Sequence, residues 1–282
     1  MIVVDAHQHF WNPVRVDYPW LEVDYPELNR PYVFADLEPH LASCGVQATV
    51  LVQSGESLED NEVMFEIARS ESRVAGIVAW VPIEDAERTD ALLETFGRAH
   101  RVVGVRTLAQ NQPDPDWLLR SDVARGLDVV ATRGLPFDFL GKFARHLRHV
   151  PTLCERHPEL RIVIDHLAKP PIGEDLVAWS DLLARAAEAP NVFAKVSGLY
   201  PAAGDRAPWT LEDIRPALAR ALELFGSSRL MFGSDWPVCE LAGGYETVVG
   251  ALFRLFEELS AEERRDLLGE TAVRFYGLAL ER

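Results

Sequence analysis

The chain has 282 residues, of which 48% are hydrophobic and 26% charged, a balance typical of a globular protein with a sizeable core. Its formal net charge of -16 argues against nucleic-acid binding, because a nucleic-acid site needs a basic surface. No apolar run approaches the roughly 20 residues that span a bilayer, so we also expect no membrane partner.

The amino terminus and the cysteines favour a cytoplasmic location. No basic region precedes a long apolar segment, so we expect no signal peptide. The three cysteines, Cys44, Cys154 and Cys239, form no C-x-x-C pair and are typical of reduced thiols in a cytoplasmic protein. Cys239 has no clear base partner in the sequence, which disfavours a role as nucleophile.

The first predicted element is a short buried strand at residues 2–4, followed by the sequence Asp5-Ala6-His7-Gln8-His9. Residues two apart in a strand point to the same side, so we expect His7 and His9 to share one face. Two such imidazoles can form half of a metal site or a pair of proton carriers. Two hydrogen-bonded histidines in a polar loop are the alternative.

A long insertion follows at about residues 11–30. It is rich in aromatic residues and prolines and has no clear helical pattern. Long loops at the carboxyl face of a barrel usually serve the site, although these aromatic side chains could also pack on the rim.

Seven further segments are short, apolar and rich in β-branched residues, and they end in polar residues. Continuous apolar runs of this kind are typical of a parallel sheet that is covered on both faces. The predicted strands are 49–53, 76–82, 102–106, 135–139, 161–166, 192–196 and 230–235, of which 135–139 has the weakest pattern.

Helical patterns, with apolar residues at a period near 3.6, lie between these strands. They cover 60–70, 90–100, 140–154, 179–186, 214–225 and 248–259. Ser57 with Asp60, and Thr210 with Asp213, are typical of helix starts, and Gly226 is typical of a helix end.

The order strand–helix, repeated about eight times, predicts one α/β domain over residues 1–282, a single (β/α)8 TIM barrel. A doubly wound open sheet is the second possibility. That fold would be favoured by a glycine-rich phosphate loop after the first strand, and the sequence has none there.

Polar and ionisable residues gather at the carboxyl ends of the predicted strands, where barrel enzymes carry their chemistry. Each residue alone could be a cap or a rim ion pair, but the whole set together indicates an active site. The set comprises His7, His9, Gln53, Trp80, Arg106, Asp138, His166, Lys169, Lys195, Ser197, Asp235 and Trp236.

Three motifs in this order resemble the amidohydrolase superfamily, of the amidohydrolase 2 type. They are DAHQHFW at 5–11, DHLAKP at 165–170 and FGSDWP at 232–237. More narrowly, the chain is similar to the branch of sugar-lactone hydrolases that includes L-fuconolactonases and L-rhamnonolactonases. The resemblance runs from the first strand to the end of the chain, and it implies a (β/α)8 barrel with its site at the carboxyl face.

The resemblance also implies roles for single residues. His7 and His9 match the histidine pair of the family's first strand, and His166 matches its sixth-strand histidine. Asp235 matches the eighth-strand aspartate, the usual general base.

The chain departs from the binuclear members of the superfamily on two strands. The fourth strand ends in Arg106 rather than in a metal-bridging lysine or glutamate, and the fifth offers Asp138 rather than a histidine. We therefore expect no two-metal site.

A single zinc ion held by His7, His9 and Asp235, with or without His166, fits the ligand types. The resemblance to the lactonase branch favours catalysis without a tightly bound metal. We therefore expect either no required cofactor or one weakly bound divalent ion such as zinc.

The expected activity is hydrolysis of a sugar lactone, a small molecule, to its open-chain hydroxy acid. Such a reaction needs a base for water, donors for the developing oxyanion and an acid for the leaving oxygen. We expect Asp235 to be the base. The expected carbonyl donors are His7, His9, His166 and Arg106, the expected hydroxyl binders Gln53, Asp138, Lys169 and Lys195, and the expected apolar walls Trp11, Trp20, Trp80 and Trp236.

Two other classes stay open at this point. One is a mononuclear zinc amidohydrolase or decarboxylase of the same superfamily, which would lose its activity on chelation and regain it with zinc. The other is a non-catalytic barrel that only binds a sugar acid, which would bind lactones without turnover. The sequence predicts no particular oligomeric state.

Overall fold

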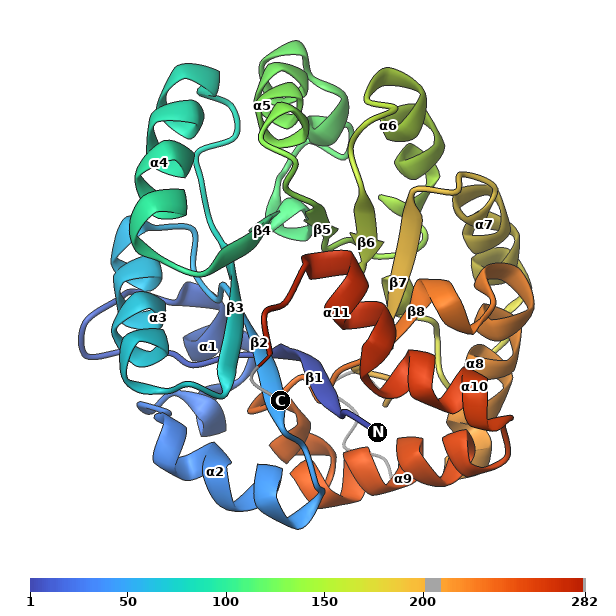
Figure 1. The fold of residues 1–282 in the computed structure, drawn as a ribbon. Helices are drawn as coiled ribbons and strands as arrows, with labels where there is room; N and C mark the ends of the chain where they lie inside the picture. The colour runs from blue at the N-terminus through green and yellow to red at the C-terminus, as the bar shows by residue number, and fades with distance from the viewer. Residues whose placement is uncertain (201–208, 281–282) are drawn as a thin grey trace.

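Eight parallel strands, hydrogen-bonded in chain order, form the centre of the computed structural model (Figure 1), which describes residues 1–200 and 209–280. The predicted (β/α)8 barrel is therefore confirmed. The strands are β1 (Val4–Gln8), β2 (Ala48–Val52), β3 (Val74–Ala79), β4 (Val102–Thr107), β5 (Phe137–Phe139), β6 (Ile162–Ile164), β7 (Val192–Val196) and β8 (Leu230–Phe232).

The barrel closes between β1 and β8 at their carboxyl ends. Gln8 and Trp236 form a parallel bridge. The backbone N–H of Asp235 donates to the carbonyl of His7 at 2.8 Å, and the N–H of His9 donates to the carbonyl of Trp236 at 2.7 Å. These bonds bring the first and the last predicted site motifs side by side.

Helices surround the strands, and one further helix, α11, lies across the end of the barrel at which the chain begins (Figure 1). The helices are α1 (Pro19–Asp24), α2 (Phe34–Ser43), α3 (Leu58–Ser70), α4 (Ala86–Ala99), α5 (Ser121–Thr132), α6 (Val150–Arg156), α7 (Val177–Ala187), α8 (Leu211–Phe225), α9 (Tyr245–Glu257), α10 (Ala261–Arg265) and α11 (Thr271–Tyr276).

The inside of the barrel near α11 is apolar. Small and β-branched side chains from the strands meet Phe275 and Tyr276 of α11 there. Each large apolar side chain that is fully buried contributes roughly 1.5–3 kcal/mol. The packing of α11 on these strand residues, here called the plug, therefore stabilises the barrel at the end that α11 covers. The strand residues are Val4, Ala6, Val50, Val52, Val78, Val163 and Met231.

The predicted helix ends are confirmed. Ser57 caps α3, because its hydroxyl accepts the N–H of Asp60 at 3.1 Å. Thr210 caps α8 in a reciprocal arrangement with Asp213, and Gly226 follows the last turn of α8.

Several predicted element boundaries were wrong. The first strand runs to Gln8 rather than ending at Val4. The insertion at 11–30 does contain a short helix, α1, and a 3-10 turn at Pro26–Leu28, both too short to show a periodic pattern. The helix expected over 140–154 begins only at Val150, and α2 and α5 were not anticipated.

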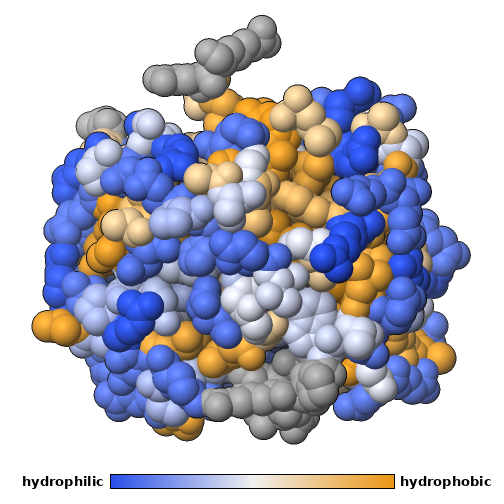
Figure 2. Space-filling view, turned by 90° about the horizontal axis from the view of Figure 1, so that it is seen from below, coloured by the Kyte–Doolittle hydropathy of each residue, from blue (hydrophilic) through white to orange (hydrophobic). Residues whose placement is uncertain are grey.

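One face of the surface mixes hydrophilic and hydrophobic areas. Figure 2, which views the molecule from below with α2 and α9 toward the reader, shows hydrophilic side chains over much of this face, interrupted by hydrophobic areas. Across residues 1–200 and 209–280, no helix combines the length and the apolar character that crossing a bilayer requires.

Candidate active site

A break in strand register aims His7 of β1, and His9 directly after the strand, at the site. The pairing of β1 with β2 shifts between Asp5 and Gln8, and bulges of this kind often redirect side chains next to sites. Adjacent residues of a regular strand point to opposite faces. Here Ala6 belongs to the interior apolar cluster, and its neighbour His7 also contacts residues of the barrel interior. The Nε2 atoms of His7 and His9 lie 3.1 Å apart.

Asp235 follows β8 in a left-handed backbone conformation, with φ of 60°. Gly233 makes this turn possible because a Cβ atom there would lie 2.6 Å from Cβ of His7. Ser234 donates its N–H to Asp5 Oδ1 at 2.8 Å. The buried Asp5 was not anticipated as a site residue, although it opens the first motif.

His166 follows β6 in a left-handed run from His166 to Lys169, with φ values of 55°, 49°, 59° and 58°. Non-glycine residues in this region cost energy and gather at functional sites. Gly198, with φ of 58°, lies against the ring, since a Cβ there would be 2.8 Å from Nδ1 of His166. Ser197 Oγ lies 2.9 Å from the same nitrogen.

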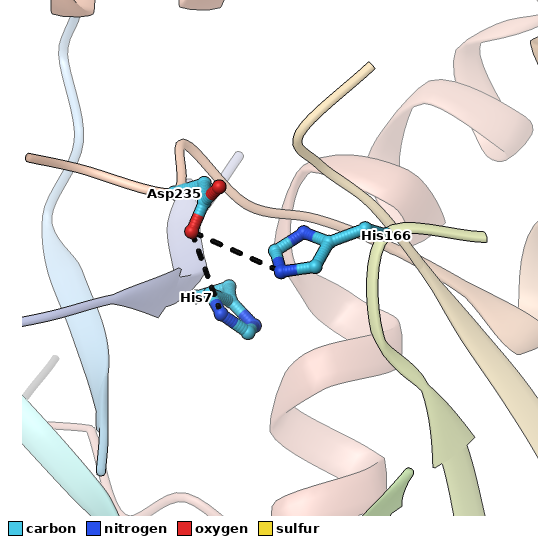
Figure 3. A group of neighbouring side chains, drawn as sticks. All are labelled: His7, His166 and Asp235. Atoms are coloured by element: carbon cyan, nitrogen blue, oxygen red, sulfur yellow. Dashed lines mark ion pairs between the residues drawn. The ribbon is translucent and has the colours of Figure 1, made fainter. Parts of the chain in front are cut away.

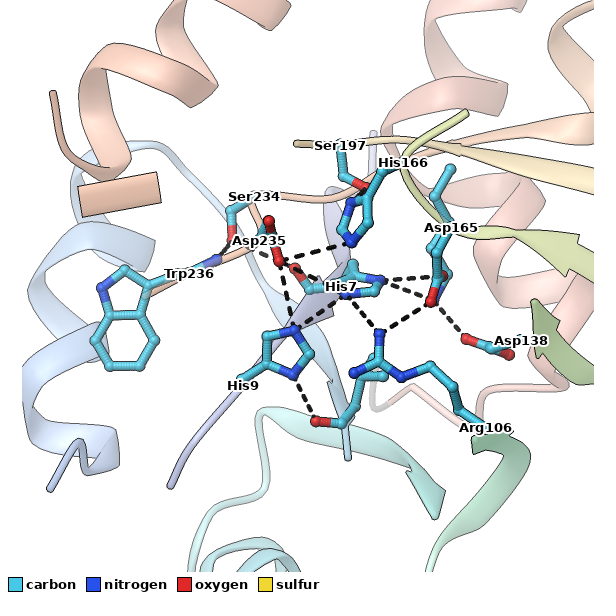
Figure 4. Close-up of polar contacts among 12 residues, drawn as sticks. His7, His9, Arg106, Asp138, Asp165, His166, Ser197, Ser234, Asp235 and Trp236 are labelled. Atoms are coloured by element: carbon cyan, nitrogen blue, oxygen red, sulfur yellow. Dashed lines mark hydrogen bonds and ion pairs between the residues drawn. The ribbon is translucent and has the colours of Figure 1, made fainter. Parts of the chain in front are cut away.

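The three imidazoles converge on one carboxylate oxygen (Figure 4), and Figure 3 shows the ion pairs of Asp235 with His7 and His166 alone. Oδ1 of Asp235 lies 3.4 Å from Nε2 of His9, 3.7 Å from that of His7 and 3.8 Å from that of His166. The structure thus brings together the four residues that the family resemblance singled out.

The other oxygen of Asp235 has a partner that sequence reasoning missed. The hydroxyl of Tyr200 donates to Oδ2 at 2.9 Å. Burial, and next the charge of Asp235, raise the pKa of Tyr200 well above its usual value, so the phenol keeps its proton. Tyr200 belongs to no motif and follows the end of β7 by only a few residues, which is the one signal that could have indicated it.

Asp165 was also missed, although it opens the second motif. It lies behind His7, where its Oδ1 is 3.2 Å from Nδ1 of His7 and its Oδ2 accepts from Arg106 at 3.0 Å. Arg106 also donates to the backbone carbonyl of Gln53. Arg106, expected at the substrate carbonyl, is therefore engaged behind His7 (Figure 4).

Burial controls the protonation of the site. It lowers the pKa of His166 to about 4, and it lowers that of His7 well below the usual value. Burial alone would raise the pKa of Asp235, but His166, His9 and His7 hold it below its usual range. At neutral pH the site therefore presents an ionised carboxylate beside neutral imidazoles at His7 and His166.

Some predicted substrate-contact residues lie in the interior of the structure. Asp138 and Lys195 are 0% exposed and pair with each other at 2.5 Å beside His7. Trp11 and Trp236 are 0% and 1% exposed. They support the rim by ring packing, with Trp11 on Trp20 and Trp236 on Phe10, instead of forming open walls.

Other predicted contacts keep free surface or free polar atoms. Trp20, Trp80 and Lys169 are partly exposed. Lys169 donates to Gln110 at 2.8 Å. The side-chain oxygen of Gln53 is buried and has no hydrogen-bond partner within residues 1–200 and 209–280, so it can still accept a hydrogen bond.

The donor set fits one zinc ion. Ligand atoms of His7, His166 and Asp235 lie within 4.8 Å of one another, and those of the expected set His7, His9 and Asp235 lie 3.1 to 3.7 Å apart. The second ring nitrogens are supported, as is usual for metal-bound histidines: Nδ1 of His166 by Ser197 and Nδ1 of His7 by Asp165.

Residues 4–278 match the family described as Amidohydrolase. The chain belongs to the amidohydrolase family. This match confirms the resemblance that the three sequence motifs indicated.

Two relatives of this amidohydrolase share one name. This chain is 36% identical to a Burkholderia ambifaria protein named L-fucono-1,5-lactonase, over 97% of this chain and 94% of that protein. A Burkholderia multivorans protein with the same name is 35% identical, over 98% of this chain and 96% of that protein. A crystal structure of an amidohydrolase from Burkholderia multivorans with bound zinc has a TM-score of 0.91 and 33% identity, and covers 99% of this chain and 100% of that one.

Proposed function

We propose that this amidohydrolase opens a sugar lactone to its hydroxy acid, and that L-fucono-1,5-lactone is the first substrate to test. The relatives named L-fucono-1,5-lactonase support lactone hydrolysis. The observation that carries the proposal is the ionised Asp235 facing three imidazoles at the carboxyl end of the barrel.

Asp235 is the base in this proposal. Oδ1 takes a proton from a water molecule as the water oxygen forms a bond to the lactone carbonyl carbon. A carboxylate with a lowered pKa is a weak base, but a fixed position next to the water compensates for that weakness. Tyr200 holds Oδ2, so Oδ1 is the oxygen that stays directed at the imidazoles.

The imidazoles stabilise the carbonyl oxygen as it gains negative charge. His9 donates its Nδ1–H to the carbonyl of Val52 at 2.7 Å, because a carbonyl oxygen can only accept. His166 is then the ring available to donate from Nε2, because Nδ1 of His7 faces the Asp165 carboxylate and Arg106 lies 3.4 Å from its Nε2. If a zinc ion is bound by His7, His166 and Asp235, it supplies additional polarisation of the carbonyl oxygen.

The ring carbon–oxygen bond breaks as the tetrahedral intermediate collapses. The proton held by Asp235 moves to the departing ring oxygen, which becomes a hydroxyl group of the product. The unpartnered oxygen of Gln53 accepts from a sugar hydroxyl, Lys169 donates to another, and Trp20 and Trp80 contact the apolar face of the ring.

The test is hydrolysis of L-fucono-1,5-lactone and other aldonolactones, followed by acid release with a pH indicator. The assay is run with a chelator and with added zinc. Turnover that survives chelation supports the residue-based mechanism, and turnover that requires zinc moves His7, His166 and Asp235 to metal binding. Absence of turnover over the whole panel in both conditions would refute the proposal.

A further inference from the structure

Four charged side chains lie buried directly behind His7. Asp138, Asp165 and Lys195 are 0% exposed and Arg106 is 3% exposed. Lys195 Nζ lies 2.5 Å from Asp138 Oδ2 and 3.0 Å from Asp165 Oδ1. Two carboxylates and two cations balance each other, so the cluster adds no net charge to the interior.

This cluster connects the site to the helix that plugs the barrel. Tyr276, the last residue of α11, donates its hydroxyl to Asp138 Oδ2 at 2.7 Å. The same oxygen accepts from Lys195, whose ammonium lies 3.1 Å from Nδ1 of His7. Three contacts therefore lead from α11 to the ring of His7, and Figure 4 shows Asp138, Asp165 and Arg106 grouped beside that ring.

Stability alone does not require these charges. Desolvation of buried ions often costs more than their attraction returns, and apolar replacements of similar volume are commonly neutral or stabilising. The interior layer just below the cluster is filled by apolar side chains. The charged side chains of the cluster are therefore better explained by their contact with His7.

We propose that Tyr276 is a positioning residue of the active site, because its hydroxyl fixes Asp138, which holds Lys195 against His7. The inference deepens the proposed function and rests on it for its kinetic test. Asp138 Oδ1 has no hydrogen-bond partner within the described part of the chain, so Tyr276 and Lys195 are what orient this carboxylate. Without the hydroxyl, Asp138 keeps Lys195 as its partner, and the balance of the Lys195 ammonium between Asp138, Asp165 and His7 changes.

The kinetic test is the variant Tyr276→Phe, which keeps the ring and removes the hydroxyl. We expect kcat to fall about ten-fold, with KM changed less than about two-fold, because the reacting geometry is disturbed and the binding surface is not. The matched control is Phe275→Leu, one residue earlier in α11, where Phe275 packs on Phe193. The control should lower Tm and leave kcat unchanged below the transition, which separates positioning from stability.

A second readout does not depend on the substrate. With 15N-labelled histidine, the ring nitrogen signals of His7, identified by their loss in His7→Gln, should shift in Tyr276→Phe. The signals of the remote His40 and His157 should not move. Unchanged His7 signals would overturn the inference, and so would a wild-type kcat in Tyr276→Phe. If no lactone is hydrolysed by the wild-type protein, the proposed function fails, but the His7 signals still decide this inference.

Discussion

The two oxygens of Asp235 have different surroundings, and this difference gives the residue its proposed role. Oδ1 faces the Nε2 atoms of three histidines, while Oδ2 accepts from Tyr200 at 2.9 Å. One oxygen is thus free for a water molecule and the other is used for orientation.

Asp235→Asn should keep the fold and lose most turnover, because an amide cannot take a proton from water. We expect kcat to fall by about 10²–10⁴-fold, the range typical of a lost general base. Circular dichroism checks the fold, and the pH-indicator assay measures kcat. A variant with a kcat near that of the wild type would exclude Asp235 as the base.

Tyr200→Phe should lower kcat by about ten-fold with little change in KM, because Oδ2 loses the donor that orients the carboxylate. Steady-state kinetics measures both constants. The matched control is Tyr32→Phe, whose ring packs on Trp11 and Trp236 away from Asp235 and whose kcat should stay at the wild-type value. Equal kinetics of the two variants would contradict the role of Tyr200.

At this scale the sequence predicted the reacting residues better than their supports. His7, His9, His166 and Asp235 stand in recognisable motifs. Tyr200 stands in none, and its contact with Asp235 depends on how two loops meet. Burial could not be read from the chain either, which is why Lys195 was expected at the substrate and lies below His7 instead.

At the scale of elements, the loop at 11–30 restricts access to the site. Its Trp11 ring lies 6.3 Å from that of His9, and Trp20 packs on Trp11 at 5.3 Å. Trp20 also donates to the carbonyl of Ser54 at 3.0 Å. The loop therefore packs beside His9, next to Asp235, which is only 7% exposed.

Trp20→Ala should therefore raise KM about ten-fold and change kcat by less than about three-fold, because a contact surface is lost while the reacting groups stay in place. Saturation kinetics with the best lactone of the panel measures both constants. Val14→Ala in the same loop is the control, since Val14 is 84% exposed and its loss should alter neither constant. A larger effect on kcat than on KM would contradict a binding role for Trp20.

The elements themselves were predictable to different degrees. Strands buried on both faces are continuous apolar runs, so all eight could be placed from the sequence. Short elements such as α1 carry too few residues for a period to show. The left-handed run from His166 to Lys169 contains no glycine, so no local sequence signal indicates its backbone conformation.

At the scale of the whole molecule, His146 should make stability depend on pH. Burial lowers its pKa to about 4, and the surrounding cations act in the same direction. The folded-state pKa thus lies below that of the unfolded chain, roughly 6.5. Between these two pH values the unfolded chain binds more protons than the folded chain. The free energy of unfolding therefore has its full value above about pH 6.5 and falls as the pH is lowered toward about 4.

His146→Asn should reduce this acid-dependent loss by about 1 kcal/mol or more. Asparagine can still accept the N–H of Lys142, which lies 3.2 Å from Nδ1 of His146, but it takes up no proton. Urea unfolding at a series of pH values between 7 and 4 measures the difference. Superimposable profiles for the variant and the wild type would rule out His146 as the source.

The closure between β1 and β8 determines when the active site forms during synthesis and folding. Asp5 and Ser234, which share a hydrogen bond at its edge, are 229 positions apart in the chain. His7 leaves the ribosome before Asp235, and the seven strands β2 to β8 are made between them. Contacts between such distant segments are the slowest to form during folding. A nascent chain therefore holds His7 and His9 before the Asp235 carboxylate that they face has been made, and the first turnover of the protein marks the completion of its barrel.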